Sequence, residues 1–317
     1  LIRKKELVLV FRNTLPVGSC DTFRNYIEDQ FGLVEGVDYN LAFVPERVME
    51  GQAIREEESL PKIIGCYNDH CYEILRETFS YLDGPVRRVE SPRAAEFCKL
   101  TDNSYRNTMF AFANELAMHA QDCDVDVIDV IQAVNADYTR TTVPQPGYTS
   151  GYCLGKDPYI FEMGFDAKDR GFKSLWYYGR QVNDYIVKFT INRLEARLKS
   201  LDSAKVCLLG FSFKEGVDDF RMSHSQMIYE KLIERGVSDV NIYDPNVEAN
   251  KYCRLNIGDE SKFNQLSPAL FQDCDAVVVC QRHAELVKLS CNTLKLESLL
   301  SSCKQGVYVY DAWNIWR

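Results

Sequence analysis

The sequence has 317 residues, 46% of them hydrophobic, which is enough for a large core and more than one domain. A formal net charge of −9 argues against a nucleic-acid partner, because binding a phosphate backbone requires a basic surface. No apolar stretch approaches the ~20 residues that a membrane-spanning helix requires. We therefore expect a cytoplasmic enzyme-sized protein without a membrane partner.

The cysteines and histidines predict neither a disulfide framework nor a metal site. Twelve cysteines are scattered along the chain without a CxxC pair, and reduced thiols in the cytosol fit this pattern better than disulfides. None of the four histidines stands at a zinc-ligand spacing from a cysteine pair, so we expect no metal. The chain starts at Leu1 without a methionine and continues at once into an apolar run, which is typical of a fragment.

Residues 1–91 alternate between β-rich and helical runs, which predicts part of a doubly wound α/β sheet. The β-rich runs are residues 7–11, 39–44, 62–66 and 86–90. Residues 92–201 are predominantly helical and predict a central helical domain. In residues 202–317 the alternation returns, with four strand-like runs, and predicts a carboxyl-terminal Rossmann-like domain.

A long helix is predicted over residues 174–200 of the central region. It is apolar on more than one face and aromatic near its start, so we expect part of it to be buried against a second copy of the chain. A homodimer is the simplest closed assembly.

A glycine-bearing loop is predicted around Cys153. Gly147 and Gly151 permit close approach of a ligand, and Lys156 and Asp157 follow the thiol by three and four residues. A nearby ammonium favours the thiolate, and a carboxylate can orient water for hydrolysis of an acylated sulfur. These residues make Cys153 a candidate nucleophile, while the alternative is a small buried core residue.

A polar stripe is predicted on the helix that begins near residue 92. Glu96, Lys99, Asn103 and Arg106 fall at steps of three and four residues and so share one face. The alternative is a solvated helix face. The apolar continuation at residues 108–118 favours a helix buried on several sides, with its polar face turned into a cleft.

Two predicted strands of the first region are followed by polar residues. Thr14 follows residues 7–11, and Glu46 and Glu50 follow residues 39–44, where doubly wound sheets place ligand-contacting loops. The alternative for each is a turn or capping residue.

A strand-to-helix junction in the last region carries Lys214 and Arg221, which could bind phosphate or form only a solvated loop with a salt bridge. No GxGxxG occurs anywhere in the sequence. The residues alone therefore predict an α/β protein with a candidate thiol site.

Five motifs, in chain order, resemble the UDP-glucose/GDP-mannose dehydrogenase family over essentially the whole chain. They are RNTLPVG (12–18), PERVMEG (45–51), AAEFCKLTDN (94–103), SGYCLGKD (150–157) and GFSFKEGVDDFRMSHS (210–225). PER in place of PEF, KLTDNSYR and GYCLGKDPY are more similar to members acting on UDP-N-acetylmannosamine or UDP-N-acetylglucosamine than to those acting on UDP-glucose.

The resemblance implies two NAD-linked oxidations of the sugar C6 alcohol to a carboxylate, with the intermediate held on Cys153 as a thiohemiacetal and then a thioester. It implies a catalytic set of Cys153, Lys99, Asn103, Asp157, Thr14 and Glu46. It implies a substrate-binding set of Glu50, Arg106, Arg180, Asn183, Gly151, Lys214 and Arg221. It implies that NAD contacts Thr14, Glu50 and Lys156.

Some positions depart from the family pattern: Ser150 replaces a glycine, His224 replaces a proline, and Trp313 replaces a residue that is often basic. Family members also carry an amino-terminal segment with GxGxxG. We therefore expect this chain to bind NAD poorly and to be inactive without that segment.

Three alternatives remain open at this stage. The chain could be a UDP-glucose 6-dehydrogenase, or a non-catalytic nucleotide-sugar binding module that uses Lys214 and Arg221. It could also be a dimer-forming structural protein in which Cys153 is inert.

Overall fold

The structure, a computed structural model, describes residues 7–166, 168–246 and 265–316. The chain forms two compact units: Leu1–Arg106 with Lys156–Tyr177, and Asn107–Gly155 with Tyr178–Arg317. It passes between them within the helices α4 (Pro92–Asp122), α6 (Tyr152–Asp166) and α7 (Leu175–Leu198). The α/β class with a helical centre is confirmed, whereas the predicted domains 1–91, 92–201 and 202–317 stay a prediction.

The first unit contains a four-stranded sheet in the order β1-β2-β3-β4. Its strands are β1 (Val8–Phe11), β2 (Asn40–Phe43), β3 (Lys62–Cys66) and β4 (Val86–Val89). The pairs β1/β2 and β3/β4 are parallel, and the central pair β2/β3 is antiparallel. The four predicted strands are thus confirmed, in a sheet of mixed direction.

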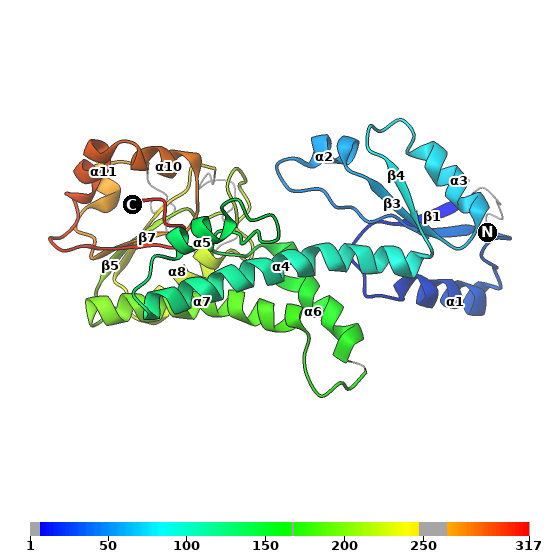
Figure 1. Cartoon of the computed structure of the whole chain (residues 1–317), viewed down its shortest axis with the longest axis horizontal. Coiled ribbons are helices and arrows are strands. Elements are labelled where there is room, and N and C mark those ends of the chain that lie inside the picture. The colour runs from blue at the N-terminus through cyan, green and yellow to red at the C-terminus, as the bar shows by residue number, and fades with distance from the viewer. Residues whose placement is uncertain (1–6, 167, 247–264, 317) are drawn as a thin grey trace. The chain divides into compact units, whose positions relative to one another are not determined.

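Helices cover both faces of this sheet. Its helices besides α4 and α6 are α1 (Ser19–Phe31), α2 (Ala53–Ser59) and α3 (Asp69–Thr78). Leu41 and Phe43 pack with α1, while Ala42 and Val44 pack with α3, because successive side chains of a strand point to opposite faces. Figure 1 shows α1 and α3 on opposite sides of the sheet. All four side chains are buried, which explains the continuous apolar run in the sequence.

The second unit contains a four-stranded sheet in the order β6-β5-β7-β8, with every pair parallel. Its strands are β5 (Lys205–Leu209), β6 (Asp239–Tyr243), β7 (Ala276–Val279) and β8 (Tyr308–Asp311). Its further helices are α5 (Val127–Asn135), α8 (His224–Glu234), α9 (Pro268–Phe271), α10 (Ala284–Ser290) and α11 (Thr293–Leu300). The predicted Rossmann-like arrangement is confirmed.

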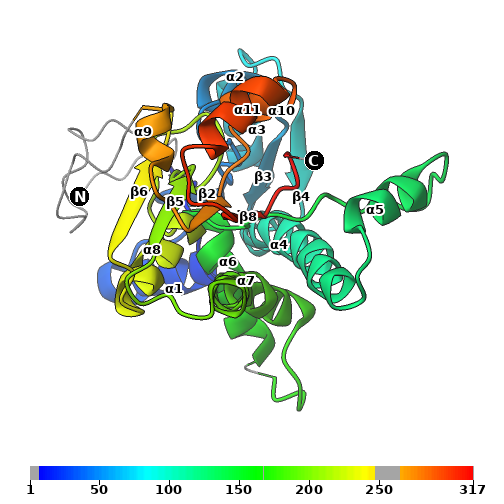
Figure 2. The same ribbon diagram turned by 90° about the vertical axis from the view of Figure 1, so that its left-hand side faces the viewer.

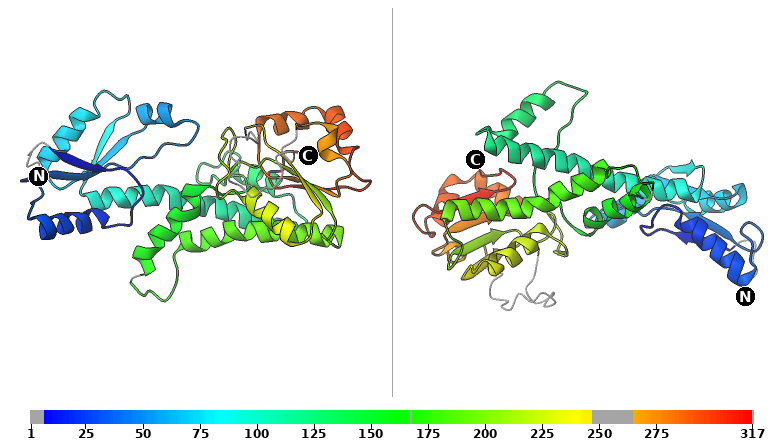
Figure 3. Two further views of the ribbon diagram at one scale, coloured as in Figure 1. Left: turned by 180° about the vertical axis from the view of Figure 1, so that it is seen from behind. Right: turned by 90° about the horizontal axis from the view of Figure 1, so that it is seen from below.

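Two apolar clusters hold helices against the faces of this sheet. Val206 and Leu208 pack with α7 and α8 on one face, and Cys207 and Leu209 pack with α9, α10 and α11 on the other. Figure 2 shows α10 and α11 across the sheet from α8, and Figure 3 shows α7 and α8 together. In the described ranges of the chain, no helix is long and apolar enough to cross a membrane.

Gly65 of β3 provides a test of the packing in the first unit. A Cβ atom there would lie 2.3 Å from the Ser91 carbonyl oxygen and 2.8 Å from the Ala95 Cβ. We expect Gly65→Ala to lower the free energy of unfolding by about 1–3 kcal/mol, because backbone must move to make room. Urea unfolding followed by circular dichroism measures this change.

The matched control is Gly164→Ala in α6, where a Cβ would meet nothing within 4 Å. Because Ala is the better helix former, this control should be neutral or stabilising by about 0.5–1 kcal/mol. Equal effects of both substitutions would contradict the packing described at β3.

Candidate functional site

Polar residues gather at the edge of the first sheet where β1 and β2 end. These strands are parallel, so the loops that carry Thr14 and Glu46 leave the same edge. The Glu46 amide donates to the Arg12 carbonyl at 3.0 Å, which joins the two loops. Thr14 and Glu46 are half-buried and Glu50 is exposed. This edge is where open α/β sheets bind ligands.

The predicted polar stripe of α4 is mostly buried. Lys99 donates to the Glu46 carbonyl. The Asn103 amide donates to Asp157 Oδ2 at 2.6 Å, and Lys156 Nζ contacts Asp157 Oδ1 at 2.5 Å. Asp157 is fully buried with both carboxylate oxygens bonded. The structure thus brings Lys99, Asn103, Lys156 and Asp157 into the first unit with Glu46, and these residues do not form a solvated helix face.

The other two members of the stripe differ. Arg106 is exposed. Glu96 is fully buried, and its carboxylate accepts from the amides of Gly18 at 2.5 Å and Cys20 at 2.8 Å. Gly18 is the residue before α1, in a left-handed conformation with φ 94°, and has no capping side chain of its own. Glu96 therefore caps α1 from a distant part of the sequence.

This cap limits how the β1–α1 turn can bind the NAD that the resemblance implies. A pyrophosphate is usually bound by free backbone amides at a helix amino terminus. At α1 those of Gly18 and Cys20 are already bonded to Glu96. The β1–α1 turn therefore does not fit the pyrophosphate. The hydroxyl and carboxylate of Thr14 and Glu46, at the open edge of the sheet, fit a polar ligand group.

Cys153 lies in the first turn of α6 and is exposed. The expectation that it lies in a loop is therefore wrong: the loop ends at Gly151, whose φ is 91°. The amino-terminal turn of a helix stabilises negative charge and is a known setting for nucleophilic thiolates. Lys156 and Asp157 follow within the same helix.

The two glycines before Cys153 are required by protein neighbours. A Cβ on Gly147 would lie 2.4 Å from the Trp313 ring, and one on Gly151 would lie 2.4 Å from the Phe213 ring. The Gly147 amide donates to Asn114 Oδ1 at 2.8 Å. Residues 147–155, here called the Cys153 segment, are thus fixed by packing. A substrate contact at Gly151 stays a prediction.

Arg180 and Asn183 of α7 are buried in the second unit. Asn183 Nδ2 donates to Asn107 Oδ1 at 2.9 Å, and its own Oδ1 accepts from Asn114 at 2.8 Å. Arg180 Nη1 contacts Asn107 Oδ1 at 3.3 Å. Hydrogen bonds among these side-chain amides link α4 to α7. Substrate binding by Arg180 and Asn183 stays a prediction.

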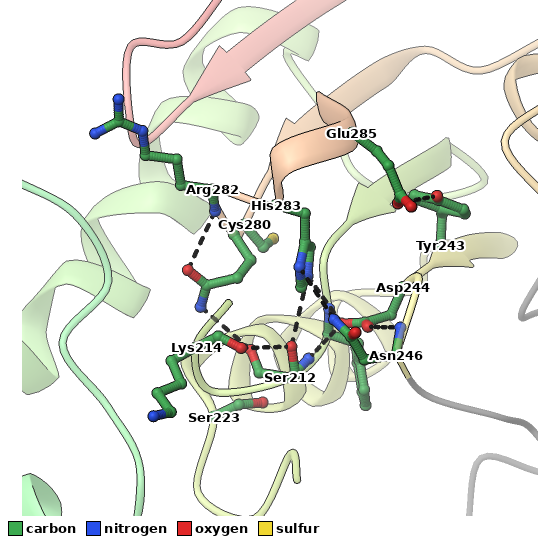
Figure 4. Close-up of polar contacts among 12 residues, drawn as sticks. Ser212, Lys214, Ser223, Tyr243, Asp244, Asn246, Cys280, Arg282, His283 and Glu285 are labelled. Atoms are coloured by element: carbon green, nitrogen blue, oxygen red, sulfur yellow. Dashed lines mark hydrogen bonds and ion pairs between the residues drawn. The ribbon is translucent and has the colours of Figure 1, made fainter. Parts of the chain in front are cut away.

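A second polar cluster lies at the carboxyl edge of the second sheet (Figure 4). Asp244 Oδ2 accepts from the amides of Phe211 and Ser212, each at 2.7 Å, and lies 3.2 Å from His283 Nε2. Burial opposes ionisation of Asp244, but the hydrogen bond from His283 and the backbone amides hold the pKa of this carboxyl below its usual value. Asp244 therefore stays ionised and fixes the turn after β5.

The predicted phosphate ligands follow this turn. Ser212 Oγ donates to the Lys214 carbonyl at 3.0 Å, and Gln281 Nε2 donates to the Ser212 carbonyl at 3.3 Å. Lys214 is half-buried, and Arg221 is exposed and paired with Asp219 at 2.6 Å. Both cations thus lie on one segment that is held at the sheet edge.

The roles of Asp244, His283 and Glu96 were not predicted from the sequence. A signal for the first two exists, because each follows a predicted strand of one parallel sheet and so belongs to the same edge. Within the described ranges, no three His, Cys, Asp or Glu side chains are grouped to hold a metal ion.

Comparison with known proteins identifies the family. Three domain profiles of the UDP-glucose/GDP-mannose dehydrogenase family match: the NAD binding domain at residues 1–83, the central domain at 93–185 and the UDP binding domain at 207–317. UDP-N-acetyl-D-mannosamine dehydrogenase of Campylobacter jejuni is 28% identical, over 91% of this chain and 71% of that protein. The Escherichia coli K12 enzyme of the same name is 26% identical, over 100% and 74%.

Among solved structures, UDP-D-ManNAc dehydrogenase from Pyrococcus horikoshii superposes with a TM-score of 0.82 at 26% identity. The match covers 97% of this chain and 69% of that chain. The two sheets, the central helices and these matches define an oxidoreductase of nucleotide sugars. The chain belongs to the UDP-glucose/GDP-mannose dehydrogenase family, and its cofactor is NAD.

The buried His224 predicts a pH dependence of stability. Burial and the charge of Arg180 lower the pKa of His224 to about 3, so the folded chain keeps this imidazole neutral at pH 5. The unfolded chain protonates it below about pH 6.5. His224 should therefore lower the free energy of unfolding by about 2 kcal/mol between pH 7 and pH 5.

Urea unfolding at both pH values tests this prediction. His224→Gln should lose that part of the decline, whereas His70→Gln, at an exposed histidine, should retain it. An identical pH dependence for His224→Gln and the parent chain would contradict a neutral buried His224.

Asp244→Ala tests the turn after β5. It leaves the amides of Phe211 and Ser212 without their acceptor, so the free energy of unfolding should fall by about 3 kcal/mol. UDP affinity should fall too, because the segment with Lys214 loses its anchor. Calorimetric titration with UDP measures the second effect. Glu230→Ala, on the exposed face of α8, should leave both quantities unchanged.

Proposed function

We propose that the chain oxidises the C6 alcohol of a UDP-N-acetylhexosamine to the uronic acid. The preferred substrate in this proposal is UDP-N-acetylmannosamine. The overall reaction consumes one alcohol, two NAD⁺ and one water, and yields the carboxylate, two NADH and three protons. The names of the relatives from Campylobacter jejuni and Escherichia coli support the sugar. The observation that carries the chemistry is the exposed Cys153 in the first turn of α6. Asp157 follows four residues later, and each of its carboxylate oxygens contacts a polar side chain.

Cys153 holds the intermediate in this proposal. Its thiolate adds to the aldehyde carbon and gives a thiohemiacetal, and loss of a hydride converts this adduct into a thioester. NAD supplies the hydride acceptor in both oxidations. Water then cleaves the thioester, which releases the carboxylate and restores the thiol. The aldehyde is never released because it stays covalently bound to sulfur.

The buried polar residues of the first unit supply the proton and charge chemistry. Lys99 and Asn103 donate hydrogen bonds to the oxyanion that develops at the reacting carbon. Asp157 and Thr14 orient the attacking water, and Glu46 contributes a carboxylate at the same sheet edge. Lys99 carries three N–H donors, so its bond to the Glu46 carbonyl leaves donors for a substrate.

The binding roles follow the two sheet edges. Thr14, Glu50 and Lys156 would contact NAD in the first unit. The UDP moiety would be bound by Lys214 and Arg221, whose charges suit a diphosphate. The remaining proposed sugar contacts are Glu50, Arg106, Gly151 and Asn183.

A cytoplasmic homodimer through the central helices completes the proposal. Phe112 of α4 and Tyr178 and Tyr185 of α7 are large apolar side chains, each about half exposed in one chain. Tyr178 and Tyr185 are seven residues apart and share a helix face. Such a face is typical of a helix that packs against a second copy.

Cys153→Ala should lower the rate of uronic acid formation in the active enzyme by roughly a thousandfold or more, because it removes the thiol that holds the acyl intermediate. Mass spectrometry of the product and the nicotinamide absorbance measure the loss. Cys123→Ala, at another exposed thiol, is the matched control and should retain activity.

Normal acid formation by Cys153→Ala would overturn the nucleophile assignment. Binding of the nucleotide sugar by the parent enzyme without any reduction of NAD would instead favour a non-catalytic binding module. Preferential turnover of UDP-glucose would contradict the proposed sugar while leaving the chemistry intact.

A further inference from the structure

Arg180 is the largest fully buried side chain in the described residues, with 1% of its surface exposed. All of its nitrogens contact acceptors of the second unit. They are Asp184 Oδ1 at 3.0 and 2.8 Å, Asn107 Oδ1 at 3.3 Å, the Thr149 carbonyl at 3.1 Å, the Leu154 carbonyl at 3.2 Å and His224 Nε2 at 3.4 Å. The guanidinium is thus fully engaged by the protein.

Two of these acceptors bracket the candidate nucleophile. Thr149 lies before Cys153 in the chain and Leu154 directly follows it, and one nitrogen, Nη1, contacts both carbonyls. The Leu154 carbonyl lacks its ordinary helical donor, because residue 158 is a proline without an N–H. Arg180 supplies the donor that Pro158 cannot. The start of α6, with Cys153 on its first turn, therefore depends on this side chain.

The same guanidinium reaches the segment that carries the phosphate ligands. His224, which begins α8, accepts from Arg180 Nη2 as a neutral imidazole. Met222, two residues earlier, accepts from the Gly151 amide at 3.2 Å through its carbonyl and has a left-handed φ of 56°. A non-glycine residue in this conformation is held there by its surroundings. Arg180 and Met222 thus join the Cys153 segment to the segment of Arg221.

We propose that Arg180, with His224 as its acceptor, is a positioning residue for Cys153. It acts on the thiol through the carbonyls of Thr149 and Leu154 and does not touch the substrate. The inference rests on the proposed function, since a positioned thiol matters to catalysis only if Cys153 is the nucleophile. It differs from a substrate-binding role because the polar atoms of Arg180 are already bonded within the chain.

Lysine cannot replace this arginine. The planar fork donates in several fixed directions, whereas an ammonium is a single point from which these acceptors cannot be reached together. Arg180→Lys therefore keeps the charge and removes the geometry. Arg197→Lys, at an exposed position of the same helix, is the matched control.

Two measurements on the active enzyme test the proposal. The first is the rate at which iodoacetamide alkylates Cys153, resolved by peptide mass spectrometry with exposed Cys123 as an internal reference. The second is kcat and KM for UDP-N-acetylmannosamine. Arg180→Lys should change the Cys153 alkylation rate and lower kcat by roughly ten- to a hundredfold, because small displacements of a nucleophile have effects of this size. KM and the Cys123 rate should stay within about threefold.

A second pair of variants keeps the test decisive if Arg180→Lys does not fold. His224→Gln retains an acceptor and should keep kcat near the parental value. His224→Leu removes the acceptor and should lower kcat and change the Cys153 alkylation rate as Arg180→Lys does. An unchanged Cys153 rate and kcat in folded Arg180→Lys would overturn the proposal. A raised KM with unchanged kcat would overturn it too, in favour of a substrate contact. The two failures give different results. If only the proposed function fails, Cys153→Ala retains activity while the Cys153 alkylation rate still changes in Arg180→Lys.

Discussion

A buried carboxylate bonded to two backbone amides recurs in both units, and the candidate sites depend on it. Glu96 binds the amides of Gly18 and Cys20 in the first unit. Asp244 binds those of Phe211 and Ser212 in the second. Such amides are the groups that a dinucleotide-binding turn offers to phosphate. Because the chain satisfies these amides itself, they are already bonded within the protein, and the turns become rigid supports.

The rigidity of these supports extends to the candidate nucleophile. Gly147 and Gly151 precede Cys153, and the space beside each is filled by an aromatic ring of the second unit, from Trp313 and Phe213. Phe213 stands next to Lys214 in the segment that Asp244 anchors. The residues proposed to bind the diphosphate and the residue proposed to carry the acyl group therefore belong to one packed unit, whose geometry is set before a ligand arrives.

The sequence predicted the elements that are determined locally and missed those that depend on distant partners. Continuous apolar runs were sufficient for the buried strands, and helical periodicity was sufficient for α4 and α7. The start of α6 was not recognised, because Gly155 and Pro158 argue against a helix and the compensating donor, Arg180, is 26 residues from Leu154. The capping role of Glu96 was missed for the same reason, since its partner Gly18 lies 78 residues away.

The network around Arg180 also shows what a buried cation can do besides stabilise a fold. Removing a guanidinium from water costs roughly several kcal/mol, and the attraction within a single ion pair rarely offsets this cost in full. Among the described residues, the one carboxylate that contacts Arg180 belongs to Asp184 and is itself 47% exposed, and the other acceptors are neutral. Net stabilisation is therefore a weak reason to keep an arginine at this position. A geometric reason remains: five donors in a fixed plane can hold two carbonyls on either side of Cys153 against α7 and α8 at once.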